Sequence, residues 1–154
     1  MGLINVASNE SVFRGIDYYK KKKVGYYKKL SEFEYKAKVK GNYNEVYDVL
    51  MNVEHPRSSK CNCPHANGKR VVCKHIMALY FTVFPLEVDK FLKELEEKQK
   101  KYVEYQEELY NKVVKHVNTM TKKELEGALI DILNVAPEWV YDRFVRDYVV
   151  EETL

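Results

Sequence analysis

The amino-acid sequence predicts an α+β protein, with a small antiparallel sheet near its N-terminus and a helical C-terminal region. Two patterns predict this class. Between residues 24 and 51, apolar and polar residues alternate, which is the period of half-buried strands. From about residue 86 onward, apolar residues recur at steps of three and four, which is the period of an amphipathic helix. We therefore expect one module over residues 1–84 and a helical region over residues 85–154.

The N-terminal module begins with a predicted helix that starts near Ser8, since Ser is a preferred cap and apolar residues at helical spacing follow it. A strand-like stretch covers Val24–Leu30. The next stretch, from Phe33 to the turn at Gly41-Asn42, alternates strictly between apolar and charged residues, and Glu45–Met51 reads as a third strand. Three strands at such short spacing indicate an antiparallel meander.

A cysteine-rich stretch, CNCPHANGKRVVCKH, follows the third predicted strand. Its Asn67-Gly68 pair is a strong signal for a hairpin turn, so Arg70–Val72 is expected to return as a short strand. Ile76–Phe84 then continues as a buried helix that stops near Pro85, which cannot continue a helical hydrogen-bond ladder.

The C-terminal region is predicted to contain one long helix, at about residues 86–118, and two shorter helices. The long helix has a seam of apolar residues at alternating four- and three-residue steps, interrupted by Gln99 and Gln106, as in a self-pairing coiled coil. Thr121 and Glu124 form a capping box for the next helix, and Pro137 opens the last one. The two shorter helices are an alternative cover for the seam.

Charge is unevenly distributed along the 154 residues. Residues 1–82 contain 15 Lys and Arg against 7 Asp and Glu, whereas residues 83–154 contain 11 against 16, so a basic front half precedes an acidic back half. No secretory h-region or membrane-length apolar run is apparent, and the cysteine count is odd. We expect an intracellular protein, cytoplasmic if its source is prokaryotic, with no membrane partner.

All three cysteines and two of the four histidines lie between Cys61 and His75. In an extended strand, Cys61 and Cys63 point to the same side, so both thiols reach one ion. A turn then returns Cys73 and His75 to it. Three thiolates and one imidazole suit Zn²⁺, and a set of four protein ligands leaves no open position for water, which indicates a structural zinc site. His65 is a weaker rival to His75 as the fourth ligand, because it lies in the turn beside Pro64.

The pattern Cys-x-Cys, nine residues, Cys-x-His resembles the SWIM zinc finger. The resemblance extends from Arg14 to Leu79. Its lead-in consists of Arg14-Gly15, Tyr18-Tyr19, Val24, Ala37-x-Val39-x-Gly41 and Tyr47-x-Val49, and its exit of Cys73-Lys74-His75-Ile76 with Ala78-Leu79. It implies that Cys61, Cys63, Cys73 and His75 hold one structural Zn²⁺. It also implies a role in DNA binding or in protein–protein contact.

A run of lysines and tyrosines precedes the finger, and such runs bind nucleic acid by pairing lysines with phosphates and stacking rings on bases. The candidate contacts are Lys20, Lys21, Lys22, Lys23, Tyr26, Tyr27, Lys28 and Lys29, together with Lys69 and Arg70 beside the cysteines. We expect a non-catalytic accessory module that binds DNA or another nucleic acid. No activated nucleophile or Gly-rich phosphate loop is apparent, so we do not expect an enzyme. The alternative is a protein-interaction adaptor or a dimerisation module that uses the C-terminal helices.

Overall fold

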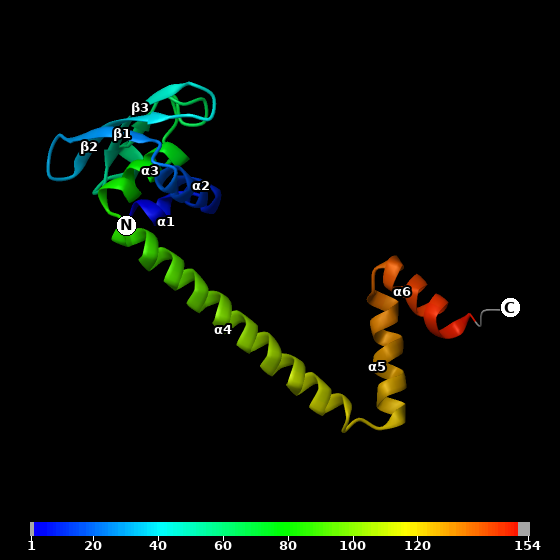
Figure 1. Cartoon of the computed structure of the whole chain (residues 1–154). Coiled ribbons are helices and arrows are strands. Elements are labelled where there is room, and N and C mark those ends of the chain that lie inside the picture. Colours follow the sequence, from blue (N-terminus) through cyan, green and yellow to red (C-terminus); the bar gives the residue numbers. More distant parts are fainter. Residues whose placement is uncertain (1, 151–154) are drawn as a thin grey trace. The chain divides into compact units, whose positions relative to one another are not determined.

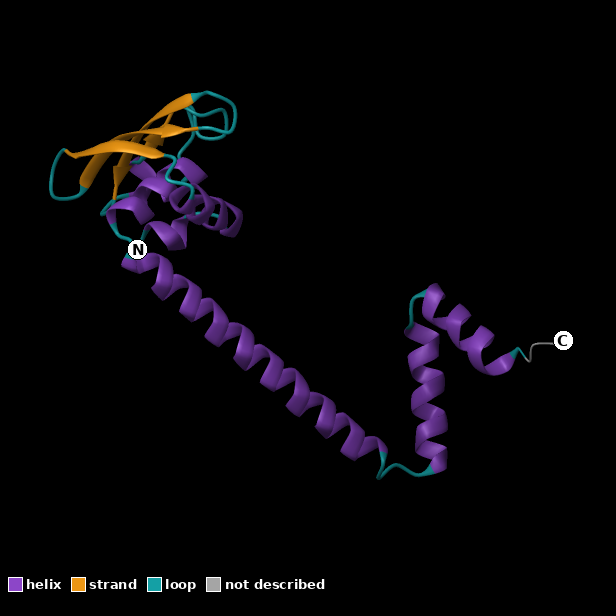
Figure 2. Ribbon diagram, viewed as in Figure 1, coloured by secondary structure: helices purple, strands orange, loops and turns teal. Residues whose placement is uncertain are grey.

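The computed structural model describes residues 2–150 and has the predicted α+β architecture. The chain divides into two compact units between Glu97 and Lys98. The first unit contains a four-stranded antiparallel sheet in the order β1-β2-β3-β4, with helices on one of its faces (Figures 1 and 2). The second unit contains helices only.

Two helices precede the sheet. The short helix α1 (Leu3–Val6), which the sequence patterns did not reveal, buries Leu3 in the core. The helix α2 (Asn9–Lys20) begins as predicted, because the Ser8 side chain accepts a hydrogen bond from the amide of Ser11. It buries the face that carries Val12 and Ile16.

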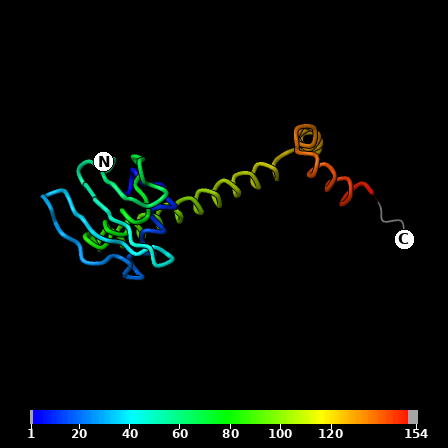
Figure 3. The backbone as a smooth tube through the Cα atoms, turned by 90° about the horizontal axis from the view of Figure 1, so that it is seen from above, coloured from blue at the N-terminus to red at the C-terminus, as the bar shows by residue number. Residues whose placement is uncertain are grey.

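The strands form the predicted antiparallel meander, and Figure 3 traces the backbone through successive strands. Its long strands are β1 (Val24–Lys29), β2 (Glu34–Lys40) and β3 (Val46–Asn52), and β4 (Lys60–Cys61) adds a short edge after the 3-10 turn η1 (Pro56–Ser58). Ala37 pairs with Val49 on the inner face, whereas Lys36 pairs with Leu50 on the outer face. Each strand therefore has one face toward the core and one toward solvent.

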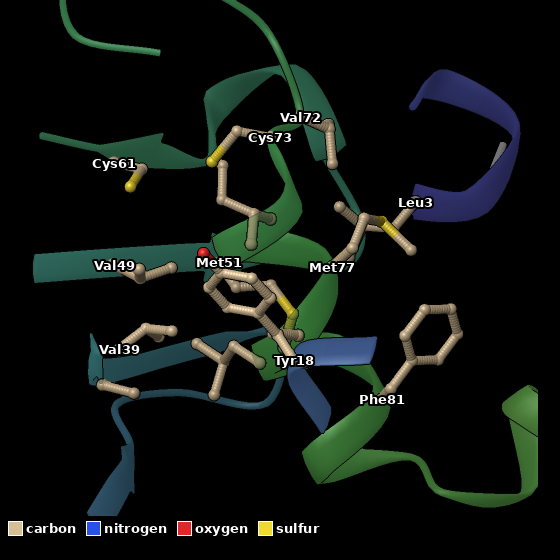
Figure 4. Close-up of a cluster of buried hydrophobic side chains, with 14 of the residues drawn as sticks. Leu3, Tyr18, Val39, Val49, Met51, Cys61, Val72, Cys73, Met77 and Phe81 are labelled. Atoms are coloured by element: carbon tan, nitrogen blue, oxygen red, sulfur yellow. The ribbon is translucent and has the colours of Figure 1, made fainter. Parts of the chain in front are cut away.

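The helix α3 (Lys74–Val83) packs against the inner face of the sheet and against α2. It is apolar on nearly all sides, since Ile76, Met77, Leu79 and Phe81 are all completely buried. Gly15 of α2 permits the close approach of the two helices: a Cβ at this position would lie 2.4 Å from the Cβ of Met77. Figure 4 shows this core from the sheet to Leu3 and Phe81.

The long helix α4 (Leu86–Val117) has 32 residues and agrees with the predicted range. Its first turns belong to the N-terminal unit, because Val88 is buried there and the ring of Phe91 packs edge-on against Phe13 at 5.8 Å. The predicted capping box at Thr121 opens α5 (Lys122–Val135), and α6 (Glu138–Phe144) runs into the π-helical turn η2 (Val145–Val149). Among residues 2–150, no helix combines the length and apolar character that crossing a membrane requires.

Candidate metal centre and the surfaces around it

Four buried side chains converge where the sheet meets α3. Cys61 ends β4, Cys63 begins the following turn, Cys73 is the N-cap of α3, and His75 lies in the first turn of that helix. One donor atom from each of them lies within 4.8 Å of all the others. Cys61 and Cys73 lie at the edge of the buried cluster in Figure 4, and none of the three cysteines forms a disulfide.

The distances identify Nδ1 as the donor atom of His75. This nitrogen lies 3.6 Å from the Cys61 sulfur and 3.9 Å from the Cys73 sulfur. Tetrahedral coordination with ordinary Zn–S and Zn–N bond lengths separates sulfur from nitrogen by about 3.6 Å. The cluster therefore fits one Zn²⁺ with three sulfur ligands and one nitrogen ligand. All four positions are protein side chains, which makes the zinc structural.

The start of α3 prepares Cys73 for metal binding. A hydrogen bond from the Cys61 thiol, contact with the His75 side chain and the amides of Ile76 and His75 lower the pKa of Cys73 to about 4. The pKa of Cys61 is shifted in the opposite direction: the hydrogen bond from its thiol to Cys73 and its burial both raise it. Zn²⁺ supplies the positive charge that keeps all three thiolates ionised at the same time. Zinc binding therefore displaces the protons of the thiols.

Aromatic rings fix the plane of the His75 imidazole. The Tyr47 ring lies over it with centroids 4.5 Å apart and a tilt of 30°, and the Tyr18 ring packs edge-on at 5.3 Å. Because Nδ1 faces the sulfur atoms, it is the atom that would bind the metal, and metal binding there leaves the proton on Nε2. Within residues 2–150, this buried Nε2 has no hydrogen-bond partner.

The turn between the two ligand pairs corrects one prediction. Arg70–Val72 does not form a returning strand. The amides of Ala66 and Asn67 both bond to the carbonyl of Cys63, so the chain coils helically instead of reversing as a tight hairpin. Gly68, with φ of +72°, completes the coil in the left-handed region that favours glycine. Val72 is consequently buried in the core and does not pair with β4.

His65, the predicted rival ligand, lies in this coil. It is exposed and does not belong to the group of converging donor atoms in the described residues. Edge pairing of β4 with β3 and a hydrogen bond from the amide of Asp48 to the Asn62 side chain hold the first ligand pair instead. Position in the fold, rather than residue type, thus distinguishes His75 from His65.

The outer face of the sheet is basic, and the helices that pack on the sheet within residues 2–97 lie on its other face (Figures 1 and 2). At one level across the four strands lie Lys28, Lys36, Leu50 and Lys60, each paired with the next. Lys38 and Lys40 extend this surface along β2, and Asp48 forms an ion pair of 3.8 Å with Lys38. We call the exposed lysines of this face (Lys28, Lys36, Lys38, Lys40 and Lys60) the lysine face.

A groove of about 860 Å³ borders the lysine face beside β4. Sheet residues form one side of it, and the coil at Ala66–Arg70 forms another. Its cationic side chains are Lys36, Arg57, Lys60, Lys69 and Arg70, and Asp48 is the acidic residue that lines it. Arg57 was not among the residues selected from the sequence, since nothing local connects it to this groove.

The predicted nucleic-acid contacts do not form one surface. Lys28, Lys69 and Arg70 lie on the lysine face or in its groove, and Tyr26 is 91% exposed at a bulge in β1 opposite Lys38. Tyr27 and Lys29 instead face Tyr35 on the inner side of the sheet. Lys36 on β2 and Lys60 on the edge strand β4 belong to the row across this face but were not among the candidate contacts.

The predicted lysine run at the end of α2 has local partners. Lys20 ends the helix, and Lys21 pairs with Asp17 at 2.9 Å. Lys22 adopts a left-handed turn with φ of 51°. Lys23 is half-buried and donates hydrogen bonds to the carbonyl of Gly41 and to the side chain of Asn42. The run therefore connects α2 to the sheet and is not a uniform solvated patch.

Comparison with known families gives a match of residues 47–84 to the SWIM zinc finger. The matched segment begins in β3, includes all four converging ligands and ends at the C-cap of α3. Comparison with curated proteins and with solved structures gives no match. The sequence pattern, the convergent donor atoms and this family match agree: residues 47–84 are a SWIM zinc finger that holds one structural Zn²⁺.

Proposed function

We propose that the finger and its sheet bind nucleic acid, with DNA as the principal ligand, as a non-catalytic accessory module inside the cell. The observation that carries this proposal is the row Lys28–Lys36–Leu50–Lys60 on the sheet face opposite the helices of the N-terminal unit (Figure 1). At about 4.8 Å between neighbouring strands, this row is about 14 Å long. That length is enough for its lysines to contact more than one phosphate of a strand.

The chemistry of the lysine face favours binding that does not depend on base sequence. Ammonium groups neutralise phosphates as point charges, whereas base reading in the major groove relies mainly on planar bidentate side chains. The arginines near the groove are Arg57 and Arg70. The exposed ring of Tyr26 is available for stacking on an unpaired base. The closed ligand set of the zinc supports a non-catalytic role.

Zinc contributes to this function indirectly. The groove wall Ala66–Arg70 lies between Cys63 and Cys73, so the metal determines the path of the chain that carries Lys69 and Arg70. Metal removal is therefore expected to weaken nucleic-acid binding without removing any lysine from the sheet.

Binding of a fluorescent DNA oligonucleotide as a function of salt concentration tests the proposal. We expect affinity to fall steeply with salt, and the double variant Lys36→Glu/Lys60→Glu to bind at least tenfold more weakly with a shallower salt slope. Lys101→Glu/Lys115→Glu in the exposed part of α4 is the matched control with the same charge change. Absence of binding at low salt, or equal losses in both double variants, would contradict the proposal.

The C-terminal helices favour a second function, protein interaction or self-association. In α5, α6 and η2, the described residues include no buried side chain, and the seam residues Leu109 and Val113 of α4 are exposed. Apolar faces of this extent on a soluble unit are typical of surfaces that bind a partner. A second copy of the chain is the simplest partner, because the seam has the heptad spacing of a coiled coil.

A further inference from the structure

A cavity of about 340 Å³ adjoins the metal centre and plays no part in the nucleic-acid proposal. Three of the four metal ligands, Cys63, Cys73 and His75, belong to its lining. The first turns of α2, the connection from β2 to β3 and the coil after Cys63 form the rest of its wall. The lysine face lies on the other surface of the sheet, and of the four ligands only Cys61 lines the groove there. We call this cavity the Tyr47 pocket. Its size is at the lower end of the range for small-molecule sites.

Cationic groups reach the pocket from two helices. Arg14 of α2 pairs with Glu10 at 2.9 Å, and both side chains are at least half exposed, so a bound anion competes readily for Arg14. Lys74 of α3 is half-buried, and its ammonium lies 4.9 Å from the centroid of the Tyr18 ring. No carboxylate of residues 2–150 forms an ion pair with Lys74.

The N-termini of both helices also contribute to the pocket. Ser8 and Ser11 bring the start of α2, which has 12 residues, to its wall, and Cys73 and Lys74 bring the start of α3, which has 10. Both positions carry the positive end of a helix dipole, and in the first turn of α3 the amides of His75 and Ile76 already donate to the Cys73 sulfur. His75, which is only 2% exposed, adds the buried Nε2 donor that lacks an acceptor. This part of the pocket favours a ligand rich in anionic oxygen atoms.

Tyrosine rings form the other part of the pocket. Tyr47 lies half-buried in the wall, and Tyr43 is 82% exposed in the connection between β2 and β3. Gly41 permits the close packing of Tyr47 and Glu45 beside it, because a Cβ there would lie 3.0 Å from the Tyr47 ring and 2.7 Å from a Glu45 oxygen. The exposed ring of Tyr43 and the half-buried ring of Tyr47 offer apolar contact to a planar group. The Glu45 carboxylate, which accepts a hydrogen bond from the Tyr43 amide at 2.9 Å, also lines the pocket and has further capacity to accept from hydroxyl groups.

We propose that the Tyr47 pocket binds a nucleoside monophosphate. Arg14, Lys74 and the N-terminus of α2 hold the phosphate, the rings of Tyr43 and Tyr47 contact the base, and Glu45 accepts hydrogen bonds from the ribose hydroxyls. This site is separate from the lysine face and gives the module a small-molecule ligand of its own.

Isothermal titration calorimetry of the zinc-loaded full chain tests the proposal, with the four ribonucleoside monophosphates, inorganic phosphate and adenosine as separate titrants. We expect at least one monophosphate to bind with one site per chain and at least tenfold more tightly than phosphate or adenosine alone. Absence of binding by all four monophosphates overturns the proposal. Equal affinity for the tightest monophosphate and inorganic phosphate also overturns it, because the rings would then have no role.

Variants identify the location of binding. Arg14→Gln and Lys74→Gln are each expected to weaken the monophosphate at least fivefold, and Lys28→Gln on the outer face is the matched control that leaves it unchanged. Zinc content is measured for every variant, because Lys74 lies between two ligands, whereas Arg14 is remote from them in sequence. Unchanged affinity in Arg14→Gln with intact zinc places binding elsewhere and contradicts the proposal. Oligonucleotide binding measured on the same samples reports on the lysine face independently.

Discussion

The two units of this chain obtain their structure in different ways. In the N-terminal unit, the sheet, α2 and α3 enclose a continuous apolar core with the metal ligands at its edge. In the C-terminal unit, residues 98–150 form helices, and α5 begins at a capping box, yet none of these residues is buried. Both units contain apolar residues at helical spacing.

The comparison teaches that amphipathic pattern alone does not determine burial. In α3, the apolar residues lie between a sheet and a second helix, and the zinc site anchors the helix start. In α4 and α5, the same residue types form apolar stripes that are exposed to solvent. Burying these stripes requires another protein surface to pack on them. We therefore expect the zinc ion and the apolar core to be sufficient to stabilise the N-terminal unit. We expect the stability of the C-terminal unit to depend on association with a partner.

The largest expected effect follows from Cys73→Ala. Losing this ligand removes zinc and the folding free energy coupled to it, on the order of 10 kcal/mol for small zinc modules. We expect native mass spectrometry to show loss of the metal, and near-UV circular dichroism to show loss of packing around the tyrosines of the N-terminal unit. Most far-UV helical signal from residues 98–150 should persist.

His65→Ala is the matched control for that experiment, because His65 lies within the same stretch but outside the ligand group. It should retain one zinc per chain. Retention of zinc by Cys73→Ala, or its loss from His65→Ala, would show that the ligand assignment is wrong.

A smaller effect is expected for Leu109→Asp in the seam of α4. If two copies pair along this stripe, a charge there should weaken self-association at least tenfold, because a carboxylate cannot be buried without a partner. Sedimentation velocity at several concentrations measures the change. Asn111→Asp adds the same side chain on the opposite face of the helix and should leave association unchanged. A wild-type chain that is monomeric throughout would exclude pairing of copies and leave a different protein as the partner.

Gly15→Ala is expected to destabilise the N-terminal unit by about 1–3 kcal/mol, as overpacking does in well-packed cores. The added methyl group would collide with the Cβ of Met77, and neither backbone can move without separating α2 from α3. Denaturant unfolding followed by near-UV signal measures the change. Wild-type stability in this variant would mean that the helices do not pack so closely.

The smallest effect, of opposite sign, is expected for Gly127→Ala in α5. No atom lies within 4 Å of the position that its Cβ would occupy, so only helix propensity changes. Alanine should stabilise the helix locally by about 0.8–1.0 kcal/mol. Amide hydrogen exchange of α5 should slow while that of α3 remains unchanged. The same substitution would thus have opposite signs in the two units, and equal signs would contradict the difference in packing described above.

Much of the fold was predictable because its signals are local. The Ser8 cap, the alternation in β2, the capping box at Thr121 and the 32-residue helix all follow from residues within a few positions of one another. The returning strand at Arg70–Val72 was predicted wrongly, because Asn67-Gly68 serves a helical coil as well as it would serve a hairpin. The bulge that turns Tyr27 and Lys29 inward has no comparable local signal.

The sequence by itself determined the zinc ligands and the class of the fold, because ligand spacing and hydrophobic period are properties of neighbouring residues. Only the tertiary structure decided which charges share a surface. Lys36, Arg57 and Lys60 come together at one groove through strand pairing and the turn after β3, and the packing of α2 on α3 brings Arg14 and Lys74 to the lining of one pocket. These contacts join residues far apart in the chain, so their positions depend on the whole core of the N-terminal unit.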